Sequence, residues 1–348
     1  MSSNVDVLRQ LLEDPVQPGA GDVCALLAEL CPDLFAPGSQ IQALRLKSRV
    51  VRVRSQVDGK VLSVVLKCLT RAVAARNALV ITRWLPGIGL ADAAPALLGT
   101  IKGETYDWQV YEDLGATVLD ATDPSPDAVA AAVELIASLH TRAAGATLLA
   151  ECRQHLDDLG MNYFVSKVAE AVARLEALSA IEGRLTAAER TVRDRLIERL
   201  QALLETVPSR TQLMQQYGGP DTLLHGDLWT INTVVIAGPE GPKARLIDWD
   251  RVGVGPVSYD LSAFLYRFPA GERPWILKQY RSAVARAGWH LPDDAELNVL
   301  FETAECARYA SRVIWPAMGL LNGTAESGHW ELAQILAWFE ALEPVLPR

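Results

Sequence analysis

The sequence predicts an α+β protein in which a small, strand-rich first part is followed by a larger helical second part. Short runs rich in β-forming residues between 41 and 69 indicate the first part. Helical spacing of apolar residues, recurring from about residue 125 to the end, indicates the second part. The two patterns meet near residues 112–116. A chain of 348 residues is long enough for two subdomains that share a cleft.

The first part is predicted element by element from its turn signals and spacing. Two short helices are expected within 4–36, interrupted by the segment PVQPGAGD. The runs IQALRLKSRVVRVRSQ and KVLSVVLKCL predict strands joined by VDGK, whose Asp-Gly pair is typical of a hairpin. A helix is expected over 71–86, and a strand over 108–119 that ends in a glycine-containing connection.

Capping signals begin the helices of the second part. Ser125 followed by Pro126 predicts a helix start, and Thr186 with Glu189 three residues later forms a capping box. His140 falls on the apolar face of the helix that begins near Ser125, so we expect a buried structural histidine there. Further on, TVVIAG and KARLID predict a short pair of strands.

Composition and charge exclude several function classes. The net charge of −9 argues against a general affinity for nucleic acid or for anionic membranes, both of which need basic patches. The five cysteines are scattered and do not follow the spacing of a zinc site or a disulfide framework. The charged N-terminus does not resemble a signal peptide, and no apolar run is long enough to span a bilayer. These features predict a cytoplasmic protein.

The most informative segment is LLHGDLWTINTVVI at 223–236, followed by Ile-Asp-Trp-Asp at 247–250. His225, Gly226 and Asp227 stand in a row between apolar runs, with Asn232 five residues after Asp227. Phosphoryl transfer from ATP needs such a set, because one carboxylate must orient the acceptor hydroxyl and take its proton. An amide oxygen and a second carboxylate must hold the magnesium ions that neutralise the phosphates. The same order of residues occurs in protein kinases.

Both motifs resemble those of the aminoglycoside phosphotransferase and choline kinase family. That family has glycine where protein kinases have arginine in the catalytic loop, as at Gly226, and a metal-binding aspartate in a sequence like Ile-Asp-Trp-Asp. The resemblance implies a bilobal, protein-kinase-like α+β fold. We expect an N-terminal helical segment over 1–38, a small nucleotide-binding lobe over 39–113, and a helical lobe over 114–348 that binds the acceptor.

The resemblance also implies roles for individual residues of the two motifs. Asp227 corresponds to the catalytic base, while Asn232 and Asp248 correspond to the magnesium ligands. His225 corresponds to a structural residue that braces the catalytic loop. Asp260, in the segment Tyr-Asp-Leu, is expected to act both as a helix N-cap and as a hydrogen-bond partner of that loop.

Nucleotide-binding residues are expected upstream. Lys67, at the end of an apolar run, resembles the third-strand lysine that contacts the α- and β-phosphates. Tyr111, Glu112 and Asp113 resemble the hinge that binds adenine, with the backbones of Tyr111 and Asp113 as its contacts. No Walker-type phosphate loop occurs in the sequence.

Two departures from the family pattern stand in the first part. No glutamate occurs between 59 and 103, and Asn77 falls where a helix glutamate would hold the lysine. The segment LKSRVVRV lacks the glycines of a phosphate-covering loop. Both leave open an alternative, a pseudokinase that binds nucleotide without turnover. A protein kinase is disfavoured because only twelve positions separate Asp248 from Asp260, too few for a long activation segment.

The predicted function is therefore transfer of the γ-phosphoryl group from ATP, with magnesium, to a hydroxyl group of a small molecule. The family's acceptors suggest an amino sugar, an aminoglycoside, an amino alcohol or a sugar. Four residues are open candidates for an acceptor pocket or for ordinary helix positions: Glu302, Glu305, Trp315 and Trp330. The sequence does not choose among these acceptors.

Overall fold

The computed structural model describes residues 8, 20–36, 39–57, 59–103, 105–324 and 327–347. Its contacts divide the chain into two compact units. The first unit comprises Met1–Leu119 together with Ile231–Asp250, and the second comprises Asp120–Thr230 together with Arg251–Arg348. A strand-rich unit and a helical unit confirm the α+β class. The expected lobe boundaries at 38 and 113 stay a prediction.

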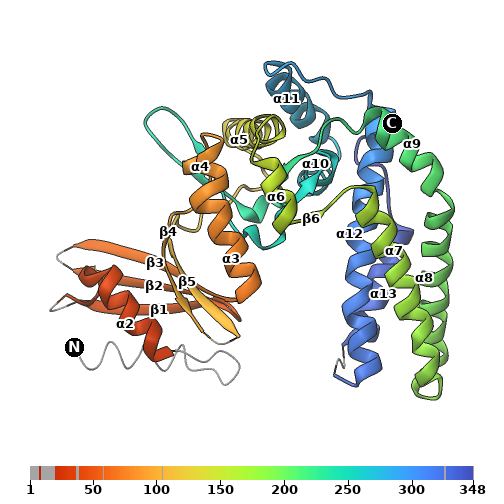
Figure 1. Cartoon of the computed structure of the whole chain (residues 1–348), viewed down its shortest axis with the longest axis horizontal. Helices are drawn as coiled ribbons and strands as arrows, with labels where there is room; N and C mark the ends of the chain where they lie inside the picture. The colour runs from red at the N-terminus through yellow and green to blue at the C-terminus, as the bar shows by residue number, and fades with distance from the viewer. Residues whose placement is uncertain are drawn as a thin grey trace. The chain divides into compact units, whose positions relative to one another are not determined.

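A five-stranded antiparallel sheet forms the body of the first unit (Figure 1). The strands lie in the order β1-β2-β3-β5-β4. Their bounds are β1 Gln40–Lys47, β2 Val50–Val57, β3 Lys60–Thr70, β4 Leu97–Lys102 and β5 Tyr106–Glu112. The segment IQALRLKSRVVRVRSQ thus contributes to two strands, β1 and β2. The expected hairpin is confirmed, because β2 and β3 pair with Val57 opposite Lys60, and Gly59 in the turn has a φ of 77°.

One face of this sheet is covered by helix α2, Ala20–Leu30 (Figure 1). Alternation along the strands directs every second side chain to this face, and the sequence places valine, leucine and tryptophan there. The buried cluster includes Val23 and Leu27 of α2 and these strand residues: Val51, Val53, Val64, Leu66, Cys68, Trp108 and Val110. This core fixes the register of β3 and β5, on which the expected nucleotide-binding residues lie.

The first unit is completed by two further segments. Helix α3, Arg71–Leu79, continues through a π-helical turn at Val80–Trp84 into α4, Leu85–Gly87, which agrees with the helix expected over 71–86. Strands β8, Thr233–Ile236, and β9, Lys243–Leu246, form the expected antiparallel pair. Backbone hydrogen bonds from Leu119 to Thr233 (2.8 Å) and from Val235 to Thr117 (3.0 Å) attach this pair to the chain beyond β5.

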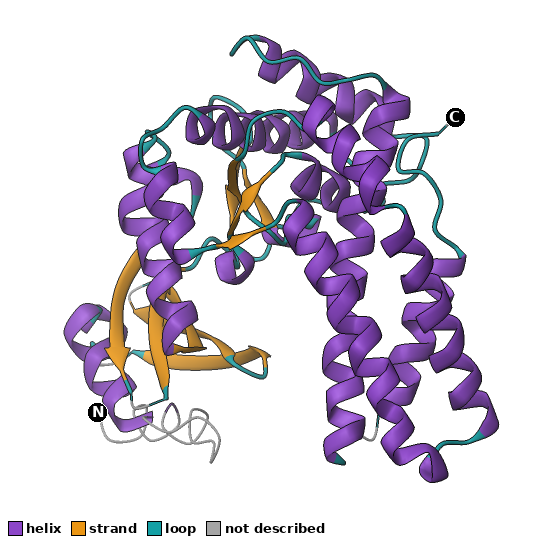
Figure 2. Ribbon diagram, turned by 45° about the vertical axis from the view of Figure 1, so that its right-hand side comes forward, coloured by secondary structure: helices purple, strands orange, loops and turns teal. Residues whose placement is uncertain are grey.

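Helices dominate the second unit, and four of them run side by side in Figures 1 and 2. These are α7 Met161–Ala177, α8 Ala187–Glu205, α12 Asp294–Asn322 and α13 Gly328–Glu340. The remaining helices are α5 Pro126–Ala144, α6 Leu149–His155, α9 Val207–Tyr217, α10 Ser258–Leu265 and α11 Arg273–Ala285. A small sheet, in the order β6-β10-β7, joins Asp157–Asp158, Gly253–Gly255 and Thr222–Leu224.

The four helices that lie side by side, α7, α8, α12 and α13, share one apolar core. Leu196, Leu200 and Leu203 of α8 follow helical spacing and are buried where α8 packs on α7 and α13, in a cluster that also includes residues of α12. The capping box that begins α8 is confirmed: the Thr186 hydroxyl accepts from the Glu189 amide at 3.3 Å, and the Glu189 carboxylate accepts from the Thr186 amide at 2.7 Å. Its position sets where the apolar stripe begins.

Other sequence expectations have mixed outcomes. His140 is fully buried, as expected. Ser125 occupies the N-cap position of α5, but its side chain makes no capping hydrogen bond. Most of the first helix expected within 4–36 lies outside the described residues, whereas α2 accounts for the second. Among the helices that the structure describes, none has the length and apolarity needed to cross a membrane.

Thr186→Ala should lower the free energy of unfolding by about 1 kcal/mol, because the first turn of α8 loses a hydrogen-bond acceptor. Urea denaturation measures this. Ser125→Ala is the matched control, since Ser125 caps by position without a side-chain bond, and it should change stability much less. Equal effects of the two substitutions would contradict the stabilising role of the capping box.

Candidate active site

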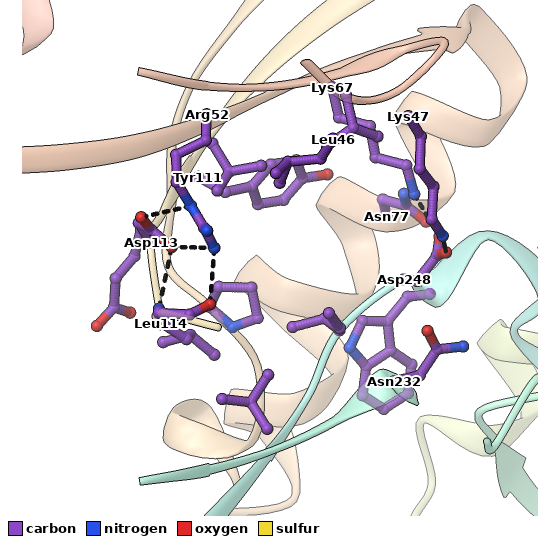
Figure 3. Close-up of a pocket in the computed structure, with 18 of the residues that line it drawn as sticks. Leu46, Lys47, Arg52, Lys67, Asn77, Tyr111, Asp113, Leu114, Asn232 and Asp248 are labelled. Carbon is purple, nitrogen blue, oxygen red and sulfur yellow. Dashed lines mark hydrogen bonds and ion pairs between the residues drawn. The ribbon is translucent and has the colours of Figure 1, made fainter. Parts of the chain in front are cut away.

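A cavity of about 240 Å³ opens within the first unit between the five-stranded sheet and the β8–β9 segment (Figure 3). Much of its wall is apolar and comes from β1, β2, β3 and β5 and from residues 231–249. One end carries Lys47, Lys67, Asn77, Asn232 and Asp248. The cavity therefore combines an apolar slot with a polar end that carries lysine ammonium groups and an aspartate carboxylate.

Lys67 lies near the end of β3, and its ammonium is largely buried, with 15% of the side chain exposed. It donates to an Asp248 carboxylate oxygen and to Asp250 Oδ1, the latter at 2.7 Å. Burial opposes the charge on Lys67, but the two neighbouring carboxylates outweigh it and raise the pKa of this lysine above its ordinary value. Lys67 is therefore held as a cation at the polar end.

Asn77, on α3, is buried at the same place. Its Nδ2 donates to Asp250 Oδ1 at 2.9 Å, so Asp250 accepts from both Lys67 and Asn77 through one oxygen. The expectation that the Asn77 amide faces the lysine directly is thus modified. Asp250, which the sequence analysis did not single out, stands between them and supplies the carboxylate that α3 lacks.

Asp248 has a φ of 67°, and it is the one described non-glycine residue with a positive φ. Such a backbone conformation is strained for a residue with a Cβ, and it persists where surrounding contacts enforce it. Lys47 Nζ lies 3.6 Å from Asp248 Oδ2. Sequence reasoning had noted only that the β1–β2 segment lacks glycine, and it missed the lysine that this segment contributes.

Asn232 and Asp248 both line the cavity, and Asn232 is 3% exposed. A backbone hydrogen bond of 2.9 Å from Ile247 to Asn232 ties the two segments together. An amide oxygen and a carboxylate are hard donors of the kind that magnesium prefers, so this pair fits the ion. No cluster of three His, Cys, Asp or Glu side chains that could hold a metal occurs among the described residues.

The segment Tyr111–Leu114 forms the far wall of the slot, where Asp113 fixes its path (Figure 3). The Asp113 carboxylate accepts from Arg52 Nη2 at 3.0 Å and from the Gly115 amide at 3.0 Å. Burial would raise the pKa of Asp113, but Ser63, Gly115 and Arg52 donate to it and keep the pKa below its ordinary value. Arg52 was not identified from the sequence.

The polar side chains of Glu112 and Tyr111 already have partners within the protein. Glu112 accepts from Arg245 at 2.7 Å, and the Tyr111 hydroxyl donates to Gln109. Burial raises the pKa of Tyr111 well above its ordinary value, so the phenol stays neutral. The side chains of Glu112 and Tyr111 are thus engaged within the protein, and the binding of a base by the backbone of this segment stays a prediction.

Asp227 belongs to the second unit, on the loop that follows β7. The fully buried Asp260 holds this loop by accepting from the backbone amides of His225 at 2.7 Å and Gly226 at 2.9 Å. Burial acts to raise the pKa of Asp260, but hydrogen bonds and the charge of neighbouring His140 keep it below the ordinary value. The expected contact between Asp260 and the loop is confirmed.

The N-cap role expected for Asp260 is wrong. Helix α10 begins at Ser258 with Val257 at the N-cap position, so Asp260 lies within the first turn. From there its carboxylate is free to reach the loop instead of the helix amides. Gly226 allows the close approach: its φ is 79° and a Cβ at this position would lie 1.8 Å from the Arg251 carbonyl oxygen.

The family profile of the phosphotransferase enzyme family, APH, matches residues 47–297, well over half of the chain. None of the curated proteins is similar enough in sequence to match. The matched residues include all of the cavity lining except Leu46, the loop that carries Asp227, and the Asp260 segment.

Solved structures with the same fold include three enzymes of low sequence identity. A choline kinase from Cryptosporidium parvum has a TM-score of 0.59 at 10% identity, over 93% of this chain and 95% of its own. A macrolide 2'-phosphotransferase from Brachybacterium faecium has a TM-score of 0.55 at 16% identity, and the match covers 89% of this chain and 98% of its own. A spectinomycin phosphotransferase, solved with ADP and spectinomycin, has a TM-score of 0.55 at 12% identity, and the match covers 88% of this chain and 90% of its own.

These findings confirm the protein-kinase-like fold that the two sequence motifs implied. The chain belongs to the APH phosphotransferase enzyme family and is a phosphotransferase of the small-molecule kinase kind.

Proposed function

We propose that the protein transfers the γ-phosphoryl group of ATP, with magnesium, to a hydroxyl group of a small molecule. The observation that carries this proposal is the cavity of the first unit. There an apolar slot ends at a buried ammonium, Lys67, which donates to the carboxylates of Asp248 and Asp250, and Asn232 lines the same cavity. A nucleotide has the matching sequence of groups, because its flat apolar base is joined to a chain of phosphates.

The adenine base would lie in the slot and bind the backbone of Tyr111 and Asp113. The Asp113–Arg52 ion pair keeps this backbone in place before the base arrives, which lowers the ordering cost of binding. Lys67 would contact the α- and β-phosphates. Lys47 offers a second cation at the same end, in a segment that has no glycine amides for the phosphates.

Asn232 and Asp248 would hold magnesium, which neutralises phosphate charge and orients the transferred group. In the structure Asp248 bonds Lys67 and lies near Lys47. Its carboxylate would change partners when the metal and the phosphates bind, while Asp250 keeps its bonds to Lys67 and Asn77. This division of work assigns one carboxylate to the metal and the other to the lysine.

Asp227 would act as the base that orients the acceptor hydroxyl and takes its proton. Support comes from the way its loop is built: Asp260 fixes the two preceding amides, and Gly226 admits the backbone conformation. A carboxylate carried by a rigid loop loses little entropy when it binds the hydroxyl.

A pseudokinase without turnover is the alternative, and it rested on the missing helix glutamate and on the missing glycines of the phosphate-covering loop. The Asp250 carboxylate weakens this alternative, because Lys67 has a charged partner even though Asn77 replaces the glutamate. A charge-assisted bond of this kind is stronger than the bond that a neutral amide could make to the ammonium.

Asp227→Asn should lower kcat by about 10²–10⁴-fold, since the amide keeps the size of the side chain but cannot accept the proton. The affinity for ATP should change little. Steady-state ADP release measures kcat, and the thermal shift given by ADP confirms that the variant is folded. Activity within a few-fold of the wild type would remove Asp227 from the mechanism.

Asp248→Ala should abolish the part of the ATP-induced thermal shift that depends on magnesium, because a ligand of the ion is lost. Asp92→Ala is the matched control, since Asp92 is an exposed carboxylate of the same unit, and it should retain the full shift. If the Asp248 variant still shows a magnesium-dependent shift, another group holds the ion.

Asp250→Asn should lower kcat/KM for ATP by about tenfold, because Lys67 loses its charged partner. Adding Asn77→Glu should recover most of the loss. The Asn77 and Lys67 nitrogens bond the same oxygen, so a longer carboxylate on α3 reaches the ammonium. In a Lys67→Met background neither substitution should change kcat/KM for ATP. Independent, additive effects of the three positions would contradict the shared contact.

A further inference from the structure

A cluster of arginine and aromatic side chains surrounds the catalytic loop within the second unit. Trp229 follows Asp227 by two residues, and its amide donates to the Asp227 carbonyl at 2.8 Å. Arg267 and Arg312 place their guanidinium carbons 4.1 and 5.3 Å from the centre of the Trp229 ring. Two residues of chain span about 7 Å at most, so the cluster adjoins the proposed base.

Helix α12 presents one face to this loop, and that face carries Glu305, Arg308 and Arg312 at helical spacing. Glu305 is buried and is used within the protein, where it accepts from Ser262 at 2.9 Å and from Arg308 at 2.5 Å. Burial would lower the pKa of Arg308, but Glu305 and further negative groups, Asp227 among them, raise it above its ordinary value. Arg308 is thus a fixed cation, matched by Glu305.

Arg312 and Arg267 have no such match. Neither forms an ion pair with a carboxylate in the part of the chain that the structure describes, and their guanidinium groups lie over aromatic rings. Arg312 also lies 4.9 Å from the ring of Tyr309, which stacks on Trp338. The other acid of this part of α12, Glu302, is paired with Arg210 at 2.6 Å.

The surroundings of Asp227 in this unit therefore carry positive charge and aromatic surface, although the whole chain has a net charge of −9. At the Trp229 cluster a cationic acceptor would meet two guanidinium groups that form no ion pair among the described residues. An acceptor with a carboxylate or phosphate group would form bidentate bonds with the same arginines. Aromatic faces beside them suit the apolar face of a ring.

We infer that the acceptor of the proposed phosphotransferase is an anionic hydroxyl compound, with Arg312 and Arg267 binding its acidic group and Trp229 contacting its ring or carbon frame. This inference rests on the proposed function, since it takes Asp227 as the site of the reacting hydroxyl. It separates this chain from an enzyme for aminoglycosides or amino alcohols, whose acceptors are cations.

Binding of matched probes to the full chain with Mg·ADP tests the inference without requiring turnover. Glucuronate, glucose and glucosamine form one series, and 4-hydroxybenzoate, 4-hydroxybenzyl alcohol and 4-hydroxybenzylamine form another. Within each series the frame is retained and the charge changes. Dissociation constants from ligand-observed NMR should favour the anion over the cation by about tenfold in at least one series. Preference for the cation, or no binding of either anion, would overturn the inference.

Variants of Arg312 then locate the preference. Arg312→Glu should reverse it, and Arg312→Lys should keep its direction. Arg174→Glu, an exposed arginine of α7, makes the same change in net charge elsewhere and should leave the preference intact. An unchanged preference in Arg312→Glu, or a change confined to the affinity for ATP, would show that the arginine serves another purpose.

The proposed function and this inference fail in different ways. If the anions bind as expected but ATP is never consumed, the transfer reaction is wrong and the charge of the site is right. If ATP is consumed with cationic acceptors, the reaction is right and the inferred acceptor class is wrong.

Discussion

The ammonium of Lys67 sets the main constraint on the first unit. A buried cation is costly unless opposite charge and hydrogen bonds surround it, and here Asp248 and Asp250 provide them from one three-residue stretch. Asn77 joins through the same oxygen of Asp250. One charge therefore ties together β3, α3 and the segment after β9. Because these elements also line the apolar slot, the ion cluster and the cavity are parts of one arrangement.

In the second unit a buried carboxylate has the corresponding role. Asp260 is fully buried, and its hydrogen bonds to the His225 and Gly226 amides hold the loop that carries Asp227. Its depressed pKa means that this carboxylate stabilises the folded state above the pKa of the unfolded chain, and that the contribution is lost only as the pH falls through the folded value. At neutral pH the loop is held by a full negative charge.

Much of the fold followed from local signals in the sequence. The Asp-Gly turn, the capping box at Thr186 and the alternation in 60–69 each act over a few residues, and all three appear in the structure. Asp260 shows the limit of such reasoning. Its sequence position beside a helix start suggested a cap, but a long-range hydrogen bond to the loop determines its role.

The proposed site shows the same division. The order of Asp227, Asn232 and Asp248 could be taken from the sequence because the three residues fall in two short motifs. Arg52, Lys47 and Asp250 could not, since each acts through a contact with a residue far along the chain. The two arginines over Trp229 come from separate segments, the chain after α10 and helix α12, and only the folded structure reveals their common surface. One weak sequence signal pointed to Asp250, because it is the second aspartate of the motif Ile-Asp-Trp-Asp at 247–250.

The central claim is that this chain retains phosphoryl-transfer chemistry although Asn77 replaces the helix glutamate. ³¹P NMR of the purified protein with ATP tests it most directly, with and without magnesium, because water can replace an unknown acceptor. The account predicts slow conversion of ATP to ADP that needs both the protein and magnesium. Tight binding of ATP with no conversion under either condition would contradict the account and would favour a nucleotide-binding pseudokinase.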